Sequence, residues 1–139
     1  MKLEVVVLAA GKGTRMRSAL PKVLHLVAGR PMLSHVLESA QKLSPDHIHV
    51  VCGHGADQVR EYFSHDLTIN WIFQAEQMGT GHAVCQALPD ISTQSTVLVL
   101  YGDIPLILPG TLQRLTDEAR DGSLALLSAS FDNPHGYGR

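Results

Sequence analysis

The sequence of 139 residues has few cysteines, no long apolar run and no large excess of charge. Cys52 and Cys85 are too few for a disulfide framework, and each lies in a segment expected to be regular structure, which favours buried thiols in a reducing compartment. No run approaches the roughly 18 apolar residues of a membrane span. Glu4 interrupts the short N-terminal run that a signal peptide would need. We therefore expect a cytoplasmic protein without a membrane partner.

Positive charge is scarce but unevenly distributed. The formal net charge of -2 gives no sign of a nucleic-acid partner or of a polybasic membrane contact. Yet of 11 Lys and Arg residues, four lie in LAAGKGTRMRSALPK, residues 8–22, a stretch without a carboxylate. These are Lys12, Arg15, Arg17 and Lys22. Such local charge favours a loop that binds an anion.

Apolar runs alternate with helical patterns along the chain. The run LEVVVLA, for example, is rich in β-branched residues and typical of a strand covered on both faces. Strands are predicted at 3–9, 47–53, 69–74, 96–102 and 123–130, and helices at 31–43, 56–63, 82–88 and 111–119. This alternation predicts a doubly wound, mostly parallel open α/β sheet in one domain. No further helical pattern follows the fifth strand, so we expect the fold to be incomplete at its C-terminus.

The loop after the first strand matches neither of two familiar phosphate-binding motifs. In a Walker A loop, Val6 would have to be glycine, and in the Rossmann pattern, which begins correctly at Gly11 and Gly13, Met16 replaces the third glycine. Backbone amides of small residues can nevertheless form an anion-binding concavity, which the loop cations would surround. The alternative is a glycine turn with solvated basic residues.

Three polar or glycine positions follow predicted strands, namely Gly11, Gln74 and Asp103. Ligands of open parallel sheets bind beyond the carboxyl ends of the strands, so we expect these positions to share a site. Asp103 suits a Mg²⁺ ligand, but a turn-forming aspartate explains it equally well. The amides of Gln74 and Gln77 suit a pyrimidine edge, while Thr80 is predicted, from its local sequence, to cap a helix.

Four motifs stand in an order that resembles a known family. They are LAAGKGTRM followed by PK, QAEQMGTGHAV (74–84), YGDIPLI (101–107) and NPHGYGR (133–139). Together they resemble the sugar-nucleotide nucleotidyltransferases, and they are similar to the uridyltransferase half of the bifunctional bacterial enzyme that makes UDP-N-acetylglucosamine. The opening motif alone would fit many nucleotidyltransferases, whereas the second and third are quite specific.

The resemblance implies a reaction, a cofactor and a domain boundary. UTP and N-acetylglucosamine 1-phosphate would give UDP-N-acetylglucosamine, for cell-wall and lipopolysaccharide synthesis, with Mg²⁺ held by Asp103 and by an asparagine beyond this chain. Residues 1–139 would be the N-terminal portion of the nucleotidyltransferase domain, and the acetyltransferase half, a left-handed β-helix, would be absent. We therefore expect the isolated fragment to be inactive or nearly so.

The resemblance also assigns roles to single residues. Arg15 and Lys22 would be catalytic, stabilising the phosphates, and Gln74 with the Gly79-Thr80 backbone would contact uracil. The implied substrate-binding residues are Leu8, Ala9, Ala10, Gly11, Lys12, Lys22, Gln74, Gln77, Gly79, Thr80, Tyr101, Gly102, Asp103 and Gly138. Arg17 has no counterpart in the motif and is expected to be solvated. A plain turn explains the glycines around Gly138 equally well.

Other possibilities remain open or are disfavoured. CTP or GTP could replace UTP, and a non-catalytic nucleotide-sugar-binding module could share the fold. A zinc site built from His47, His49, Cys52 and His54 is disfavoured, because alternation along a strand makes these side chains diverge. An unprotected sheet edge would favour self-association.

Overall fold

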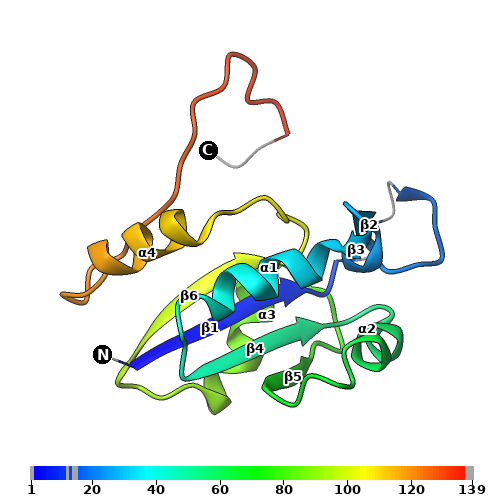
Figure 1. Cartoon of the computed structure of the whole chain (residues 1–139), viewed down its shortest axis with the longest axis horizontal. Helices are drawn as coiled ribbons and strands as arrows, with labels where there is room; N and C mark the ends of the chain where they lie inside the picture. The colour runs from blue at the N-terminus through cyan, green and yellow to red at the C-terminus, as the bar shows by residue number, and fades with distance from the viewer. Residues whose placement is uncertain (1, 12, 14–15, 137–139) are drawn as a thin grey trace.

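The computed structural model describes residues 2–11, 13 and 16–136. Its main sheet is parallel and has the strand order β5-β4-β1-β6 (Figure 1). The strands are β1 (Lys2–Ala9), β4 (His47–Cys52), β5 (Ile69–Phe73) and β6 (Ser95–Tyr101). Each begins and ends within two residues of a predicted strand. The central strands β1 and β4 are buried on both faces, as their continuous apolar runs predict, whereas the edge strands β5 and β6 alternate between buried and exposed residues. The expected parallel open sheet is confirmed.

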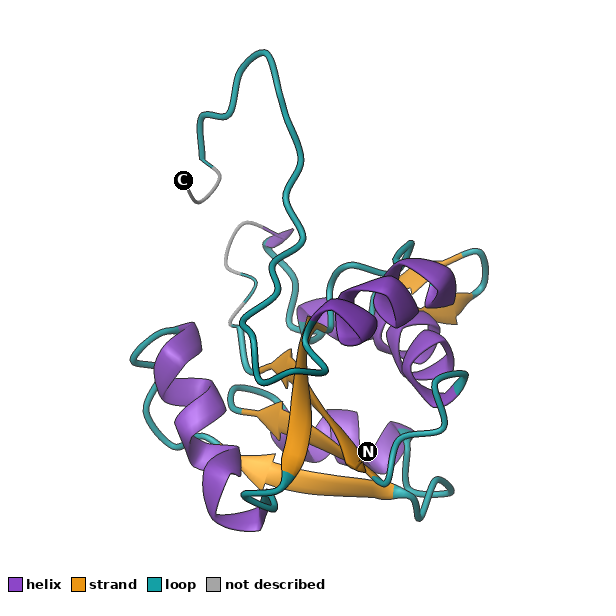
Figure 2. Cartoon of the chain, turned by 90° about the vertical axis from the view of Figure 1, so that its left-hand side faces the viewer, coloured by secondary structure: helices purple, strands orange, loops and turns teal. Residues whose placement is uncertain are grey.

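Helices cover both faces of this sheet, as Figure 2 shows. The α-helices are α1 (Met32–Gln41), α2 (Ala56–Tyr62), α3 (Thr80–Ala87) and α4 (Pro109–Glu118), and short 3-10 helices are η2 (Lys22–Leu24) and η3 (Leu88–Asp90). The larger apolar core lies between one sheet face and the buried sides of α1, α2 and α4. The smaller core lies under α3 on the other face. The sheet is therefore doubly wound, as predicted. No helix among the described residues is long and apolar enough to span a membrane.

The predicted fifth strand, residues 123–130, is wrong. This segment forms no strand in the structure, and it leads away from the body of the molecule toward the C-terminus (Figure 1). Leu124 and Leu126 are 87% and 80% exposed. An apolar run becomes a strand only when a neighbour supplies backbone hydrogen bonds and a covered face. Within the described part of the chain this segment has no pairing neighbour.

The sequence did not predict a small hairpin between η2 and α1. Strands β2 (Leu26–Val27) and β3 (Arg30–Pro31) pair antiparallel. Ala28 and Gly29 connect them with φ angles of 50° and 79°. Two positive φ angles in succession form the tight turn whose twist suits a two-residue hairpin.

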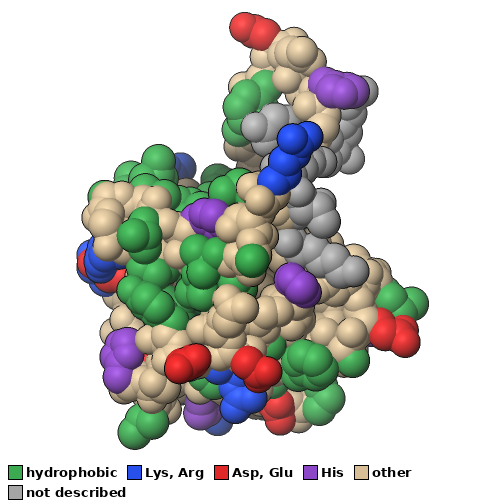
Figure 3. All heavy atoms as spheres, turned by 90° about the vertical axis from the view of Figure 1, so that its right-hand side faces the viewer, with side chains coloured by type: hydrophobic (Ala, Val, Ile, Leu, Met, Phe, Trp, Pro, Cys, Tyr) green, Lys and Arg blue, Asp and Glu red, His purple; other side chains and the backbone are tan. Residues whose placement is uncertain are grey.

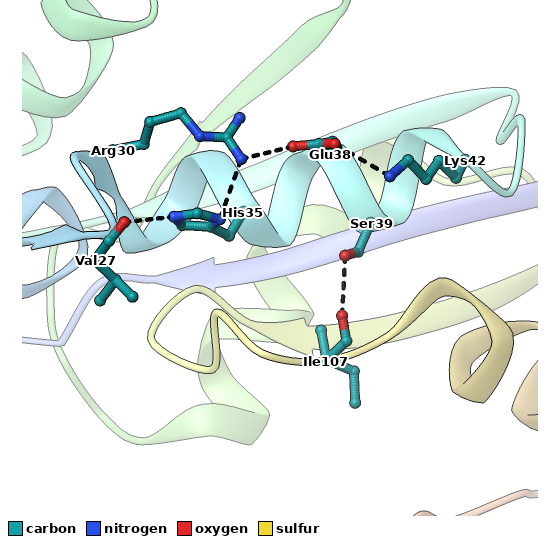
Figure 4. A network of polar contacts seen from close by, with 7 residues as sticks. All are labelled: Val27, Arg30, His35, Glu38, Ser39, Lys42 and Ile107. Carbon is teal, nitrogen blue, oxygen red and sulfur yellow. Dashed lines mark hydrogen bonds and ion pairs between the residues drawn. The ribbon is translucent and has the colours of Figure 1, made fainter.

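Side chains on α1 hold this hairpin and the loop after β6 (Figure 4). His35 Nε2 donates to the Val27 carbonyl oxygen at 2.7 Å, so its Nδ1 accepts from Arg30 at 3.2 Å. Ser39 donates to the Ile107 carbonyl oxygen at 2.9 Å, which ties α1 to the segment that follows Asp103. Glu38 pairs with the two cations drawn beside it, and hydrogen bonds from Arg30 and then Lys42 lower its pKa.

A buried polar network joins all four strands near their amino ends. Glu4, 1% exposed, accepts hydrogen bonds from His49 Nε2 (2.9 Å), Ser95 Oγ (2.6 Å) and the Ser92 backbone N–H (3.0 Å). Asn70 Nδ2 lies 2.9 Å from His49 Nδ1, on the opposite side of the ring from Glu4. Burial alone would raise the pKa of Glu4, but these hydrogen bonds lower it to about 2.

Candidate functional site

A cavity of about 330 Å³ opens at the carboxyl ends of the strands. Figure 3 shows the molecule from this side, toward which the strand arrows of Figure 1 point. The cavity is lined by Leu8, Ala9, Ala10, Gly11, Lys22, Val23, Gln74, Gln77, Gly79, Thr80, Ala83, Tyr101 and Asp103. Ligands of open parallel sheets bind at this edge, so its position agrees with the site expected from the sequence.

Most of the sequence-predicted site residues meet around this cavity. Gly102 does not line it, but it lies between the lining residues Tyr101 and Asp103, and its N–H donates to the Leu8 carbonyl oxygen at 2.9 Å. A Cβ atom there would stand 3.2 Å from that oxygen, so glycine permits the close approach of β6 to β1. Lys12, Arg15 and Gly138 lie outside the described residues. Their roles stay predictions.

Val23 and Ala83 line the cavity but were not predicted from the sequence. Both are small apolar residues beside motif residues, and each is at least 95% buried in the packing of η2 or α3. A sequence signal for them would have been their position beside motif residues, Val23 directly after Pro21-Lys22 and Ala83 inside QAEQMGTGHAV. Small apolar side chains at a cavity wall leave room for a ligand and exclude water from part of its surface.

The loop after β1 brings Lys22 to the cavity. Gly13 has a φ of 56°, and a Cβ on it would stand 2.8 Å from the Lys22 Cβ atom. Only glycine accommodates both conditions without strain. Lys22 begins η2, and the next two residues, Val23 and Leu24, are buried and anchor this turn. Gly13 therefore allows the loop to place Lys22 at the cavity.

Lys22 Nζ forms an ion pair with Asp103 Oδ2 at 2.6 Å. The contact links the segment after β1 to the segment after β6 at the wall of the cavity. Both side chains are partly exposed, 40% and 32%. Such a pair contributes little to stability and can be exchanged for other partners, because water solvates each charge when the two separate.

Asp103 could hold a divalent cation only if water and a bound phosphate supply the remaining oxygen ligands. Its carboxylate lies at the cavity and already contacts a cationic group. Among the described residues no group of three or more His, Cys, Asp or Glu side chains is placed to hold a metal ion. Mg²⁺ often takes one or two carboxylates and completes its shell with water and phosphate oxygens. The donor set fits that arrangement, and not a metal cage made by protein alone.

Two residues of the disfavoured zinc site, His49 and Cys52, have surroundings in the structure that do not suit a metal. His49 is held by Glu4 and Asn70, as described above. Cys52 is buried, as expected, and burial raises the pKa of its thiol to about 12. A thiol that stays protonated at neutral pH is a poor metal ligand. Cys85 is exposed, so the expectation of a buried thiol there is wrong.

The amides predicted to face a base lie between β5 and α3. Gln74 is 2% exposed, and its Nε2 lies 2.8 Å from His82 Nδ1 and 3.5 Å from the Gly79 carbonyl oxygen. Gln77 Nε2 donates to the Ala10 carbonyl oxygen, which bridges the loop after β5 to the loop after β1. These two amides line the same cavity as Lys22 and Asp103.

The predicted capping role of Thr80 is wrong. Gly79 is the N-cap of α3, with a φ of 98°, and its carbonyl oxygen accepts the Ala83 N–H at 3.1 Å. Among the described residues no side chain caps this helix. Glycine adopts the positive φ that the entry into the helix requires, so Thr80 moves one position into the helix and lines the cavity.

Comparison with known proteins identifies close sequence relatives. A family model described as a MobA-like NTP transferase domain matches residues 5–137. The chain is 59% identical over 139 residues to the bifunctional protein GlmU of Pseudomonas paraeruginosa, a match that covers 100% of this chain and 30% of that protein. The chain therefore spans less than a third of the length of this curated relative.

Solved structures share the fold at lower identity. A nucleotidyl transferase from Methanothermobacter superposes with a TM-score of 0.74 at 23% identity, covering 84% of this chain and 57% of that one. Rv0371c of Mycobacterium tuberculosis in complex with manganese gives a TM-score of 0.70 at 25% identity, covering 84% and 58%.

Proposed function

Because the chain belongs to the MobA-like NTP transferase family, we propose that its cavity takes part in forming UDP-N-acetylglucosamine and pyrophosphate from UTP and N-acetylglucosamine 1-phosphate. The observation that carries this proposal is that Lys22, Asp103 and Gln74 border one cavity. They supply a cation for phosphate, a carboxylate for a divalent metal and an amide for a base. The product would serve peptidoglycan and lipopolysaccharide synthesis in the cytoplasm.

The proposed reaction is a nucleotidyl transfer without a protein nucleophile. A phosphate oxygen of the sugar phosphate attacks the α-phosphorus of UTP and forms the new P–O bond. The bond from the α-phosphorus to the bridging oxygen breaks, and pyrophosphate leaves with its electron pair. Catalysis then consists of alignment of the two substrates and stabilisation of developing negative charge.

Lys22 is the described residue best placed for the phosphates. Its ammonium group lies at the cavity and is held by a partner that phosphate oxygens can replace. Within the proposal, Arg15 and Lys12 add further positive charge from the same loop. Arginine can meet phosphate oxygens with two parallel hydrogen bonds, which would fix the orientation of the transferred group.

Asp103 is the proposed protein ligand of Mg²⁺. The ion would neutralise charge on the phosphate oxygens. The manganese complex of the related fold supports a divalent metal in general. Release of Asp103 from Lys22 would make both charges available together, the carboxylate for the cation and the ammonium group for the phosphates.

The proposal concerns a protein longer than this chain. The curated relative is more than three times as long, and we propose that residues 1–139 form the N-terminal portion of its nucleotidyltransferase domain. The second metal ligand and further sugar contacts would then come from elsewhere, so the 139-residue chain should bind UTP weakly and show little or no turnover.

Binding of nucleotide to the 139-residue chain tests the proposed function. Isothermal titration with UTP and Mg²⁺ should give measurable affinity, and Lys22→Met should weaken it by about 10- to 100-fold, because a charged hydrogen bond to phosphate is lost. Arg17→Asn is the matched control, since it removes an exposed cation of the same loop whose φ of 48° asparagine tolerates. Equal affinities in all three proteins would refute the role of Lys22.

Two alternatives give different results in related experiments. Stronger binding of CTP or GTP than of UTP would point to another sugar-phosphate nucleotidyltransferase. Metal-independent binding of UDP-sugar without turnover by the full-length protein would point to a non-catalytic binding module. The GlmU match favours the uridyl reading over both.

We also propose that the isolated chain self-associates through the free edge of β6. No strand pairs with this edge in the described part of the chain. Val97, Val99 and Tyr101 on β6 are 38%, 39% and 46% exposed, and a groove of about 620 Å³ runs between β6, α4 and residues 122–127. Unpaired strand edges pair readily with an identical edge of another copy. A monomeric mass at all concentrations in sedimentation equilibrium would contradict this.

A further inference from the structure

The Gly79 carbonyl oxygen and the His82 ring together determine the orientation of the Gln74 carboxamide. The Gly79 carbonyl oxygen, 3.5 Å from Gln74 Nε2, can only accept a hydrogen bond, so it favours the amide nitrogen on that side. His82 Nδ1 lies 2.8 Å from the same nitrogen. It therefore accepts a hydrogen bond from Gln74, and the proton of the neutral ring is on Nε2.

A second amide competes for the same imidazole. Gln86 Nε2 lies 3.2 Å from His82 Nε2, and a neutral ring has one acceptor nitrogen, so both amides cannot donate to it. The contact with Gln74 is shorter, and Gln74 is 2% exposed whereas Gln86 is only partly buried and can turn to water. The buried amide would lose more by going unpaired, so the Gln74 contact determines the tautomer.

The orientation leaves the Gln74 carboxamide oxygen for the cavity. No donor to this oxygen occurs among the described contacts. Among the described residues, His25 Nε2 is the one fully buried side-chain nitrogen or oxygen atom that lacks a hydrogen-bond partner, so the Gln74 oxygen is not such an atom. The Gln74 oxygen is therefore not sealed in the interior. Since Gln74 lines the cavity, its free acceptor is available to a ligand there.

We infer that His82 is a positioning residue for base selection, which acts by holding the Gln74 carboxamide with its oxygen toward the cavity. This inference rests on the proposed function. An acceptor in this place pairs with the ring N–H of uracil, whereas cytosine offers an unprotonated ring nitrogen that also accepts. Two facing acceptors repel, so the pocket prefers UTP to CTP. His82 touches neither substrate and acts through Gln74.

Two variants and a control separate this role from simple packing. His82→Leu removes the acceptor and releases the Gln74 amide to rotate. His82→Asn retains an oxygen acceptor near the position of Nδ1 and should restore the wild-type orientation. Gln86→Met is the control, because it removes the competing amide and leaves the Gln74 contact intact.

The first measurement needs no nucleotide. In ¹⁵N-labelled chain, the Gln74 side-chain NH₂ group should give signals protected from solvent exchange in the wild-type, His82→Asn and Gln86→Met proteins. In His82→Leu the protection should fall at least tenfold. Unchanged protection in His82→Leu, measured in a variant that unfolds at the wild-type temperature, would overturn the positioning role.

The second measurement is the ratio of UTP to CTP affinity by isothermal titration. His82→Leu should lower this ratio about tenfold, as expected for a buried hydrogen bond that can no longer discriminate, and His82→Asn should recover it. An unaltered ratio in His82→Leu, in a chain that prefers UTP, would overturn the inference while the proposed function stands. A wild-type preference for CTP would overturn both. A wild-type chain that binds neither nucleotide would instead refute the proposed function, and the exchange measurement would still decide whether His82 orients Gln74.

Discussion

The two ends of the sheet each contain a pair of oppositely ionising side chains, and the pairs are built differently. Toward the amino ends of the strands, Glu4 and His49 are both 2% exposed in their side chains and have hydrogen-bond partners on several elements. At the carboxyl ends, Lys22 and Asp103 have each other and are partly exposed. The first pair is fixed in the interior, whereas the second can be separated by a ligand.

The difference reflects the cost of leaving a charge unpaired. A buried carboxylate cannot turn to water, so every lone pair that lacks a donor destabilises the fold. An exposed ion pair is worth little, since solvent replaces each partner. A site that must release its charges to a substrate therefore needs a partly exposed pair such as Lys22 and Asp103. A contact that holds strands together needs a buried and fully hydrogen-bonded pair such as Glu4 and His49.

The largest expected effect comes from breaking the buried pair. Glu4→Gln places an amide N–H against the His49 Nε2–H and removes the charge that three donors stabilise. Loss of one partner of a buried pair costs about 3 kcal/mol or more, so the free energy of unfolding in urea should fall by about that amount. His47→Gln, on an exposed neighbouring position of the same strand, should leave it within about 0.5 kcal/mol. A loss below about 1 kcal/mol in Glu4→Gln would show that the network is dispensable.

The buried Glu4 carboxylate also makes the fold sensitive to acid. The pKa of Glu4 is about 2 in the folded protein, below its ordinary value of 4.5, so its carboxylate stabilises the fold above about pH 4.5. That stability is lost as the pH falls from about 4.5 through about 2, and it is at most about 3 kcal/mol. Unfolding free energies measured between pH 7 and pH 2 should fall less steeply in Glu4→Gln than in the wild type. Parallel curves would contradict the assignment.

The smallest expected effect on stability comes from breaking the exposed pair. Asp103→Asn should change the free energy of unfolding by less than about 1 kcal/mol. It should also strengthen the binding of metal-free pyrophosphate a few-fold, because Lys22 loses the carboxylate that competes with phosphate. A large loss of stability, or weaker pyrophosphate binding, would mean that this pair is structural like the one at the other end.

Much of the site was predictable because two kinds of signal agree. Motif residues after separate strands converge, since the carboxyl ends of parallel strands lie at one edge of the sheet. Gly11, Gln74 and Asp103 accordingly line one cavity. Predictions from the local sequence failed where the backbone conformation of an adjacent residue determines the structure. The helix cap fell on Gly79 and not on Thr80, because the turn into α3 needs a positive φ.

The buried network around Glu4 could not be predicted from the sequence either. Nothing in the sequence around Glu4 distinguishes it from a charge that merely interrupts an apolar run. Its partners, His49, Ser92 and Ser95, come from 45 to 91 positions away. Pairing over such distances depends on strand register, which a single sequence does not reveal.

Local hydrophobic periodicity and chain connectivity, both readable in the amino-acid sequence, suffice to predict the alternation of strands and helices, the parallel sheet and the edge at which the candidate site lies. Three further features could be seen only in the folded chain: which charges are buried and which are exchangeable, the absence of a strand at residues 123–130, and the contact between His82 and Gln74. Each of these depends on burial and on contacts between distant segments, which arise only when the elements pack.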